Sequence, residues 1–430
     1  MSRTVFILLT LLSFTSHGQN IKINTERLSE NWRILKAYGL NEATQGNDRI
    51  AFSDYNLAAI RMINQKLTSL GMDVKIDAAG NLIATRPGKD NLLPPIAFGS
   101  HIDCVPNGGH FDGQIGVLGA IEIIETLVEN NLQTRHPLEL IVFSNEESGV
   151  FGSRALAGTL TDASLNVMTP SGLTNAMGAK KLGGDAKKIL SIARKPGSLH
   201  AFLELHIEQG GILEEKKLDI GIVQGIVGLR WWDVTVVGTS NHGGTTPMNK
   251  RQDALLAAAK FVQLVNSVVT SIPGRQVGTV GRIEAFPGAP NVIPGKVVLS
   301  LELRDLSEDK IDQLFAEIKA KTAEIVADSQ VQFNFTPISA TGKAALTDYR
   351  IQKAIQKEAE KLNFTYQYMP SGAGHDAQEM SHIAATGMIF IPSKGGISHA
   401  PQEYSSFKDV GQGTQLLLNT ILSLDKMDKL

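Results

Sequence analysis

The chain has 430 residues, of which 42% are hydrophobic and 20% charged, so we expect more than one folded domain and exclude a disordered chain. Its 41 basic and 43 acidic residues give a formal net charge of -2, which excludes nucleic-acid binding that relies on bulk positive charge. The single cysteine, Cys104, excludes an intramolecular disulfide.

The first 18 residues are typical of a secretory signal peptide. A short basic start precedes an apolar run over residues 5–14, and Ser16 and Gly18 place small side chains just before Gln19. The apolar run is too short to span a bilayer. We therefore expect cleavage after residue 18 and export of the mature chain, either to the periplasm or to the exterior, without a membrane span.

From residue 25 to about residue 221, helical and extended patterns alternate. Helical periodicity covers 24–38, 54–70 and a stripe from Val117 to Val128. Extended runs lie at 73–76, 81–84, 95–98, 138–143 and 201–205, whereas 161–195 has too weak a periodicity to assign. Alternation of this kind predicts an α/β domain with a mostly parallel sheet.

A different order of elements follows at residues 229–337. Extended runs at 232–237, 277–284, 296–303 and 331–336 enclose two helical segments, 251–269 and 309–326. This β-α-β-β-α-β order predicts a ferredoxin-like domain. The α/β alternation then resumes, with helices at 348–361, 376–383 and 407–424 and strands at 364–368 and 387–391. We predict a discontinuous catalytic domain, residues 19–228 and 338–430, with a second domain inserted at 229–337.

Side chains that bind metals follow the expected strands. The carboxyl ends of strands in an open α/β sheet form its ligand-binding edge, so residues after different strands meet there. Imidazole and carboxylate together suit Zn²⁺, Mn²⁺, Co²⁺ or Ni²⁺, and the number of ligands favours a two-metal site with a bridging carboxylate. The residues in these positions are His101, Asp103, Asp112, Glu146, Glu147, His206 and His399.

Each of these residues taken alone has an ordinary structural explanation. A histidine at a strand end is often a hydrogen-bonded core residue, a glutamate pair is often a solvated loop, and an aspartate before a helix is often an N-cap. Their coincidence at one sheet edge favours a metal site instead.

Longer motifs carry a resemblance to a known family. Gly99-Ser100-His101-Ile102-Asp103, Asp112-Gly113, Glu146-Glu147, the stretch 204–210 and Ile397-Ser398-His399 resemble the dinuclear metallohydrolases that include aminoacylase and carboxypeptidase G. The stretches 240–248, 290–294 and 371–377 are most similar to the branch containing N-carbamoyl-L-amino acid hydrolase, β-ureidopropionase and allantoate amidohydrolase. The resemblance covers nearly the whole mature chain.

The resemblance implies a ligand set for two divalent cations, Zn²⁺, Mn²⁺, Co²⁺ or Ni²⁺. His101, Asp112 and His206 would hold one cation. Asp112, Glu147 and His399 would hold the other, so that Asp112 bridges the two.

It also implies the catalytic groups. Asp103 would orient His101 and fix its tautomer, and Glu146 would act as the general base. His242, with Asn291, would donate hydrogen bonds to the oxyanion of the tetrahedral intermediate. Both of these donors lie in the inserted domain.

Substrate recognition is implied for three further residues. Arg304 would bind a substrate carboxylate through its planar guanidinium, whereas a surface ion pair with Asp305 or Glu302 is the competing interpretation. Gln209 and His375 would line the pocket at the carbamoyl end of the substrate.

The expected reaction is hydrolysis of an N-carbamoyl-L-amino acid to the amino acid, ammonia and carbon dioxide. Allantoate amidohydrolysis, N-acyl amino acid or dipeptide hydrolysis, and a non-catalytic binding protein are the alternatives. By resemblance we expect a homodimer formed through the inserted domain, which also acts as a lid. Whether His242 serves its own subunit or the partner stays open.

Overall fold

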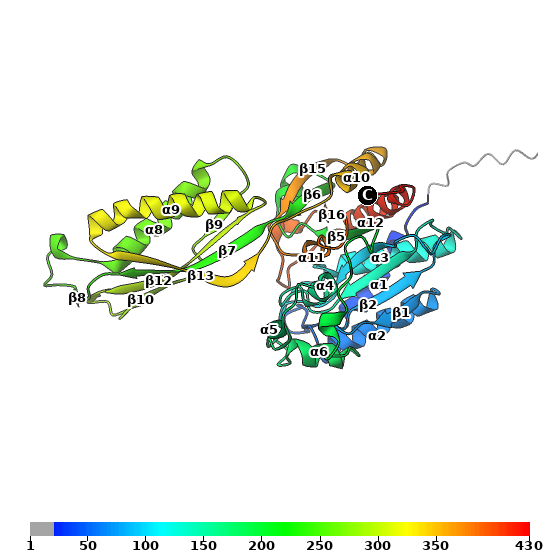
Figure 1. Ribbon diagram of the computed structural model, residues 1–430, viewed down its shortest axis with the longest axis horizontal. Helices are drawn as coiled ribbons and strands as arrows, with labels where there is room; N and C mark the ends of the chain where they lie inside the picture. The colour runs from blue at the N-terminus through cyan, green and yellow to red at the C-terminus, as the bar shows by residue number, and fades with distance from the viewer. Residues whose placement is uncertain (1–20) are drawn as a thin grey trace, which may run out of the picture.

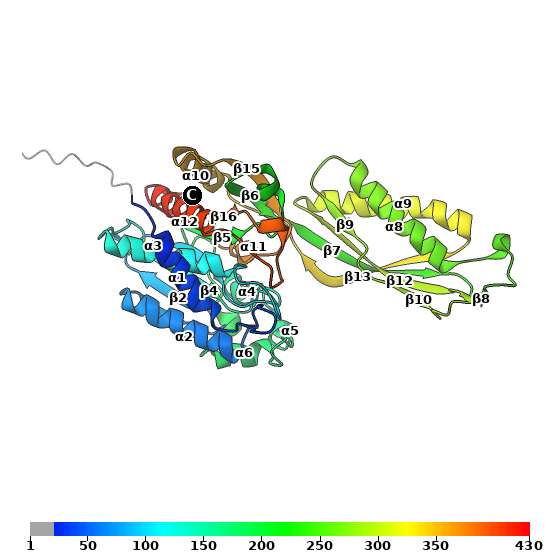
Figure 2. The same ribbon diagram turned by 180° about the vertical axis from the view of Figure 1, so that it is seen from behind.

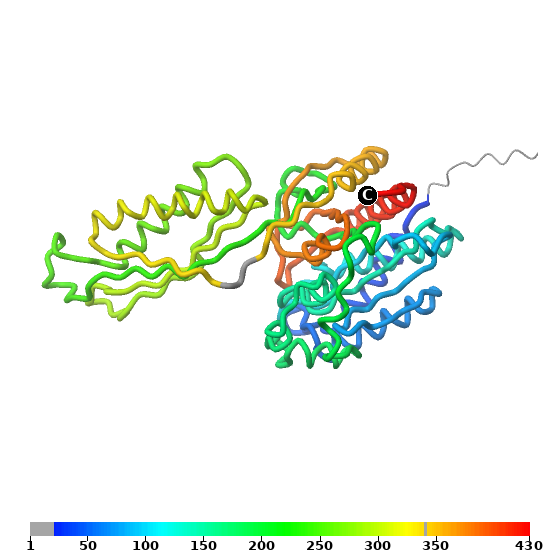
Figure 3. Tube along the Cα trace, viewed as in Figure 1, coloured from blue at the N-terminus to red at the C-terminus, as the bar shows by residue number. Residues whose placement is uncertain are grey.

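The computed structural model describes residues 21–430, without the side chains of 339–341, so the expected signal peptide lies outside the described residues. Two sheets with separate hydrophobic cores form two lobes (Figure 1). We call residues 228–342 the smaller domain and the rest the larger domain. The Cα trace shows the chain leaving the larger domain for the smaller one and returning (Figure 3).

The larger domain contains a nine-stranded sheet in the order β1-β2-β4-β3-β5-β16-β6-β14, with β15 paired to β6. Its central strands β4, β3, β5 and β16 run parallel, which confirms the predicted α/β class, and antiparallel pairs flank them. Strand β6 was not expected from the sequence. The strands are β1 Asp73–Ile76, β2 Leu82–Arg86, β3 Ile96–His101, β4 Leu138–Phe143, β5 Ala201–Ile207, β6 Ile220–Ile226, β14 Ala345–Leu346, β15 Tyr366–Ser371 and β16 Thr386–Ile391.

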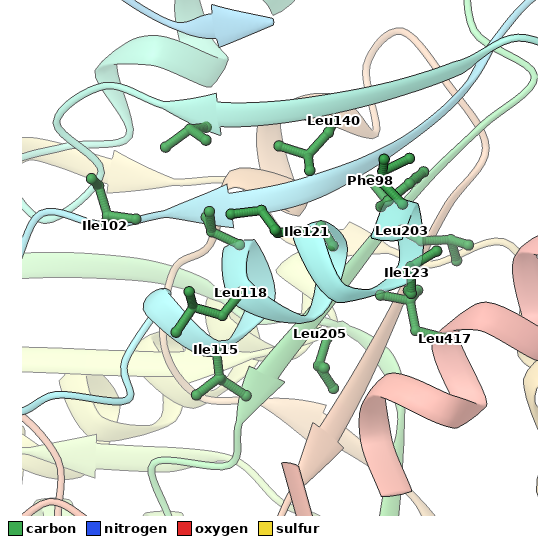
Figure 4. Packing of buried hydrophobic residues seen from close by; sticks show 14 of the residues in the cluster. Phe98, Ile102, Ile115, Leu118, Ile121, Ile123, Leu140, Leu203, Leu205 and Leu417 are labelled. Atoms are coloured by element: carbon green, nitrogen blue, oxygen red, sulfur yellow. The ribbon is translucent and has the colours of Figure 1, made fainter. Parts of the chain in front are cut away.

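Helices cover both faces of this sheet, as continuous apolar strands require. Helix α3 is buried along nearly its whole length because it lies on β3 and β5 while α1 and α12 cover its other side. Its side chains interlock with Leu205 and Leu417 (Figure 4). The helices are α1 Thr25–Lys36, α2 Asp54–Ser69, α3 Gln114–Glu129, α4 Phe151–Ala157, α5 Asp162–Leu165, α6 Asn175–Lys181, α7 Ile212–Lys216, α10 Tyr349–Lys361, α11 Asp376–Met380 and α12 Phe407–Leu424.

The smaller domain is an antiparallel sheet, β10-β12-β7-β13, with α8 and α9 on one face (Figure 2). The expected strand 277–284 is in fact two short strands, β9 and β10, which both pair with β12. Strand β13 continues five residues beyond the predicted boundary at 337. The elements are β7 Gly228–Val237, α8 Ala254–Ser271, β9 Val277–Thr279, β10 Ile283–Phe286, β12 Lys296–Asp305, α9 Glu308–Ser329 and β13 Gln332–Gly342, with a separate ribbon of β8 Asn241–His242 and β11 Val292–Ile293.

Helix α8 is long and apolar enough, by length and composition, to cross a membrane, which was not expected from the sequence. Its inward side chains, including Ala258, Phe261 and Val265, are buried, and the helix packs on β7, β9, β12 and α9. A helix in the core of a globular domain satisfies the same criterion, so its apolar composition is explained by this packing.

Candidate metal centre

The expected ligands meet at the carboxyl edge of the parallel strands. His101 is the last residue of β3, His206 lies at the end of β5, and Glu147 follows β4. Asp112 directly precedes Gly113, the N-cap of α3, while His399 lies in the loop beyond β16. The structure therefore brings together all five side chains that the sequence assigned to metal binding.

Asp112 lies between two groups of ligands. Its Oδ1 is 3.0 Å from His206 Nε2 and 3.7 Å from His101 Nε2, and its Oδ2 is 3.1 Å from His399 Nε2. Glu147 Oε2 is 3.4 Å from the same His399 nitrogen. Within each group the ligand atoms all lie within 4.8 Å of one another. Because its two oxygens face different groups, Asp112 can bridge two cations.

Main-chain carbonyls fix the tautomers of two histidines. His101 Nδ1 lies 3.0 Å from the carbonyl oxygen of Asp103, and His206 Nδ1 lies 2.9 Å from that of Ile207. A carbonyl can only accept, so each Nδ1 carries a proton, and each Nε2 faces the site, where it can bind a metal once it has lost its own proton.

Asp103 acts on His101 through its main chain and not through its carboxylate. Its carboxylate is 3.8 Å from His101 Nδ1, too far for a hydrogen bond, and the main chain of Asp103 orients the ring instead. The carboxylate accepts the backbone N–H groups of Glu146 and Glu147 at 3.4 and 3.3 Å. Asp103 thus positions the glutamate pair with its side chain and His101 with its backbone.

Acidic side chains outnumber the sources of positive charge in the part of the site lined by Asp112, Glu146 and Glu147, so their protonation is strongly perturbed. Burial, and then the charges of neighbouring carboxylates, raise the pKa of Glu146 well above its usual range and that of Glu147 to about 8. Burial also opposes ionisation of Asp112, but hydrogen bonds from His206 and His399 outweigh it and hold the pKa of Asp112 low. The same contacts raise the pKa of His206, against its burial, and that of His399 to about 9. Crowded carboxylates with imidazoles are a donor set that fits borderline divalent cations.

Gly113 makes room for His101. Its φ of +65° is in the left-handed region, and a Cβ at this position would lie 2.2 Å from His101 Nε2. Only glycine can therefore connect Asp112 to helix α3 without displacing the ligand.

A cavity of about 330 Å³ opens over the ligands. Glu146, Gln209 and His375 all line it, as expected from the resemblance. Gln209 Nε2 donates to Asp112 Oδ2 at 2.7 Å, and the His375 ring packs on His206 with 4.4 Å between centroids. The cavity thus joins the metal ligands to groups that can contact a substrate.

Arg304 reaches this cavity from the smaller domain. Its Nη1 donates to the carbonyl of Gly372 in the larger domain at 2.6 Å, and its Nε donates to Glu302 at 2.6 Å. The ion pair with Glu302 that competed with a substrate role is therefore present, and Arg304 lines the cavity as well.

His242 and Asn291 do not join the cavity of their own chain. They are exposed on the β8–β11 ribbon, at the end of the smaller domain farthest from the larger one (Figures 1 and 2). The N–H groups of Gly244 and Thr245 donate to His242 Nδ1 at 3.0 and 3.1 Å. The proton is therefore on Nε2, which is left as an exposed hydrogen-bond donor.

Two buried glutamates at the site were missed from the sequence. Glu204, inside β5, accepts from Ser100 Oγ at 2.6 Å and from the N–H of Ala377 at 2.9 Å. An acidic residue between Leu203 and Leu205 in a buried strand was a usable signal. Glu403 contacts the segments of Asp112 and His399, and nothing in its sequence context marked it.

Comparisons with known proteins agree with this geometry. The model of the family described as Peptidase family M20/M25/M40 matches residues 97–423. The N-carbamoyl-L-amino-acid amidohydrolase of Paenarthrobacter aurescens is 37% identical over 94% of this chain and 99% of its own length. The ureidoglycolate hydrolase of Arabidopsis thaliana is 37% identical over 88% of this chain and 82% of its own length. The crystal structure of a hydantoinase/carbamoylase family amidase from Burkholderia multivorans is 32% identical and matches 95% of this chain and 99% of that chain, with a TM-score of 0.88.

Removal of single ligands is expected to change the metal content in a defined order. Stripped protein reloaded with Mn²⁺ and freed of excess metal should retain two cations per chain by elemental analysis. The His399→Ala variant should retain one, and Asp112→Ala should lose both, because Asp112 belongs to both ligand groups. His382→Ala, a change at an exposed histidine, is the control and should retain two. Two cations in Asp112→Ala would contradict the shared ligand.

Proposed function

The chain belongs to peptidase family M20/M25/M40 and is a metal-dependent hydrolase, and from that premise we propose that it cleaves the carbamoyl C–N bond of N-carbamoyl-L-amino acids. Water and the carbamoyl compound give the amino acid, ammonia and carbon dioxide. The observation that carries the proposal is the pair of ligand groups sharing Asp112, next to Glu146 and within one cavity with Arg304.

The residues divide the chemistry between them. The two ligand groups would hold two divalent cations, which would supply Lewis acidity and lower the pKa of the attacking water. Glu146 takes the proton from the attacking water and delivers it to the leaving nitrogen. It is suited to both steps because burial raises its pKa, and because Glu147 beside it is occupied as a ligand.

Binding is assigned to groups on both domains. Arg304 exchanges its bond to the Gly372 carbonyl for the carboxylate of the substrate, which a planar guanidinium binds with two parallel hydrogen bonds. Gln209 and His375 contact the carbamoyl end, where the cavity meets the ligands. The intact set of ligands, together with Glu146, argues against a non-catalytic binding protein.

A second candidate is hydrolysis of ureidoglycolate or allantoate. It is favoured by the plant ureidoglycolate hydrolase, which shares the same 37% identity with this chain as the bacterial carbamoyl-amino-acid enzyme.

Ammonia release by the reloaded enzyme separates these candidates. We expect metal-dependent release from N-carbamoyl-L-amino acids and at least a hundredfold loss of kcat in Glu146→Gln, since general acid–base catalysis contributes about 10²–10⁴-fold. Release from allantoate or ureidoglycolate alone would select the second candidate. Activity only on N-acyl amino acids or dipeptides would refute both.

We also propose that the active enzyme is a homodimer formed through the smaller domain. On α8, Leu255, Leu256 and Val262 are exposed, and β10 is an edge strand with Ile283 and Phe286 exposed. A second copy of the chain would cover these apolar side chains. The distance of the β8–β11 ribbon from its own cavity supports a dimer in which His242 and Asn291 complete the active site of the partner.

Mixing two inactive variants tests this arrangement. Glu146→Gln and His242→Ala are each expected to be inactive alone. After denaturation and joint refolding, about a quarter of the wild-type activity should return, because half of the dimers are mixed and one of their two sites is complete. No recovery, with mixed dimers shown by mass spectrometry, would place His242 in its own subunit's site.

We further propose that residues 1–18 direct export of the chain. Expressed in a Gram-negative host, the full-length protein should appear in the periplasm or medium with Gln19 as its first residue, determined by N-terminal sequencing. A variant lacking residues 2–18 should stay in the cytoplasm. A cytoplasmic full-length chain that retains its first 18 residues would contradict the proposal.

A further inference from the structure

One buried carboxylate close to the ligands has no part in the proposed chemistry. Glu403, only 3% exposed, lies in the loop between β16 and α12. Its Oε1 accepts the backbone N–H groups of Phe111 and Asp112 at 2.8 and 3.0 Å. Its Oε2 accepts Ser398 Oγ at 2.8 Å and the N–H of His399 at 3.3 Å.

These four hydrogen bonds join two segments that are far apart in the chain. One segment carries Asp112, the shared ligand, and the other carries His399, which belongs to only one ligand group. Each oxygen of Glu403 is committed to one segment, so the length of this side chain sets how closely the two approach. A carboxylate that accepts several N–H and O–H groups is held in a single position.

The space around Glu403 is closed. A Cβ at Gly109 would lie 2.0 Å from Glu403 Oε1, so the chain leading to Asp112 passes directly over the carboxylate. Ser398 Oγ also lies 3.1 Å from Asp112 Oδ2, which places one hydroxyl between Glu403 and the shared ligand. Neither segment can move without breaking contacts to Glu403.

The two ligand groups depend on this connection to different degrees. His101 and His206 lie on β3 and β5, whose backbones are held by neighbouring strands. His399 is half exposed, at 50%, and lies in a loop with a φ of +56°. No strand holds the backbone of His399 in place. Its backbone N–H is bonded to Glu403 instead, so the ligand group that contains His399 depends more on Glu403 than the group of His101 and His206 does.

We propose that Glu403 is a positioning residue that holds Asp112 and His399 in register and thereby sets the affinity for the cation bound by Asp112, Glu147 and His399. The inference rests on the proposed two-cation centre. Contacts behind first-layer ligands typically change metal affinity by about 10–100-fold when they are removed.

Two variants distinguish the effect of the charge of Glu403 from the effect of its side-chain length. Glu403→Gln keeps the length but loses the charge, and Glu403→Asp keeps the charge but is too short to reach both segments. Titration of stripped protein with Co²⁺ by calorimetry, together with its visible absorption, measures both binding steps without substrate. In both variants we expect the binding step that His399→Ala abolishes to weaken by about 10–100-fold and the other step to change by less than threefold.

Glu358→Gln is the matched control. Glu358 is also buried, at 6% exposure, and its side chain pairs with Lys361 on α10. The Glu358→Gln variant should bind two cations with wild-type affinities, even if its melting temperature is lower than that of the wild type. Wild-type affinities for both cations in either folded Glu403 variant would overturn the proposal, and should one variant fail to fold, the other decides. A wild-type chain that binds fewer than two cations would overturn the two-cation centre itself, which is a different result.

Discussion

The burial of several carboxyl groups at one edge of the larger sheet is the constraint on which the rest of the molecule depends. Asp112, Glu146 and Glu147 line the same cavity, and the side chain of each is almost completely buried. Such a cluster is stable only if positive charge is shared through it. In the described chain that charge is supplied by histidines whose pKa values are raised, and divalent cations take over this role when they bind.

The fold supplies the rigidity that this cluster needs. Strands β3, β4, β5 and β16 are parallel and adjacent, so the ligands that follow them emerge at one edge. Helix α3, covered on all sides, anchors Asp112 from behind. His399 comes from the long loop between β16 and α12, and Glu403 ties that loop to the segment of Asp112.

The α/β class and the metal ligands could be predicted because their signals are local: apolar runs define strands, and ligand residues follow directly. Asp103 was expected to contact His101. Whether its carboxylate or its main-chain carbonyl makes that contact depends on the backbone conformation, which the sequence does not reveal. We predicted a single strand in place of β9 and β10 because the three residues between them have no strong turn signal. Glu403 could not be found from the sequence because its partners Phe111 and Asp112 become neighbours only after the chain has folded. The remote position of His242 depends on the shape of the whole smaller domain, which no local pattern encodes.

The link between the domains has a mechanical consequence. One residue separates β6 from β7, and two residues separate β13 from β14. Both crossings are paired side by side, through Leu229 with Gly342 and Ile226 with Ala345. Two crossings that are hydrogen-bonded side by side form a narrow two-stranded connection. Such a connection bends easily perpendicular to its plane, whereas twisting or in-plane shear would strain both crossings at once. Any swing of the smaller domain would therefore be restricted to one direction, which would keep Arg304 aligned with the cavity that it lines.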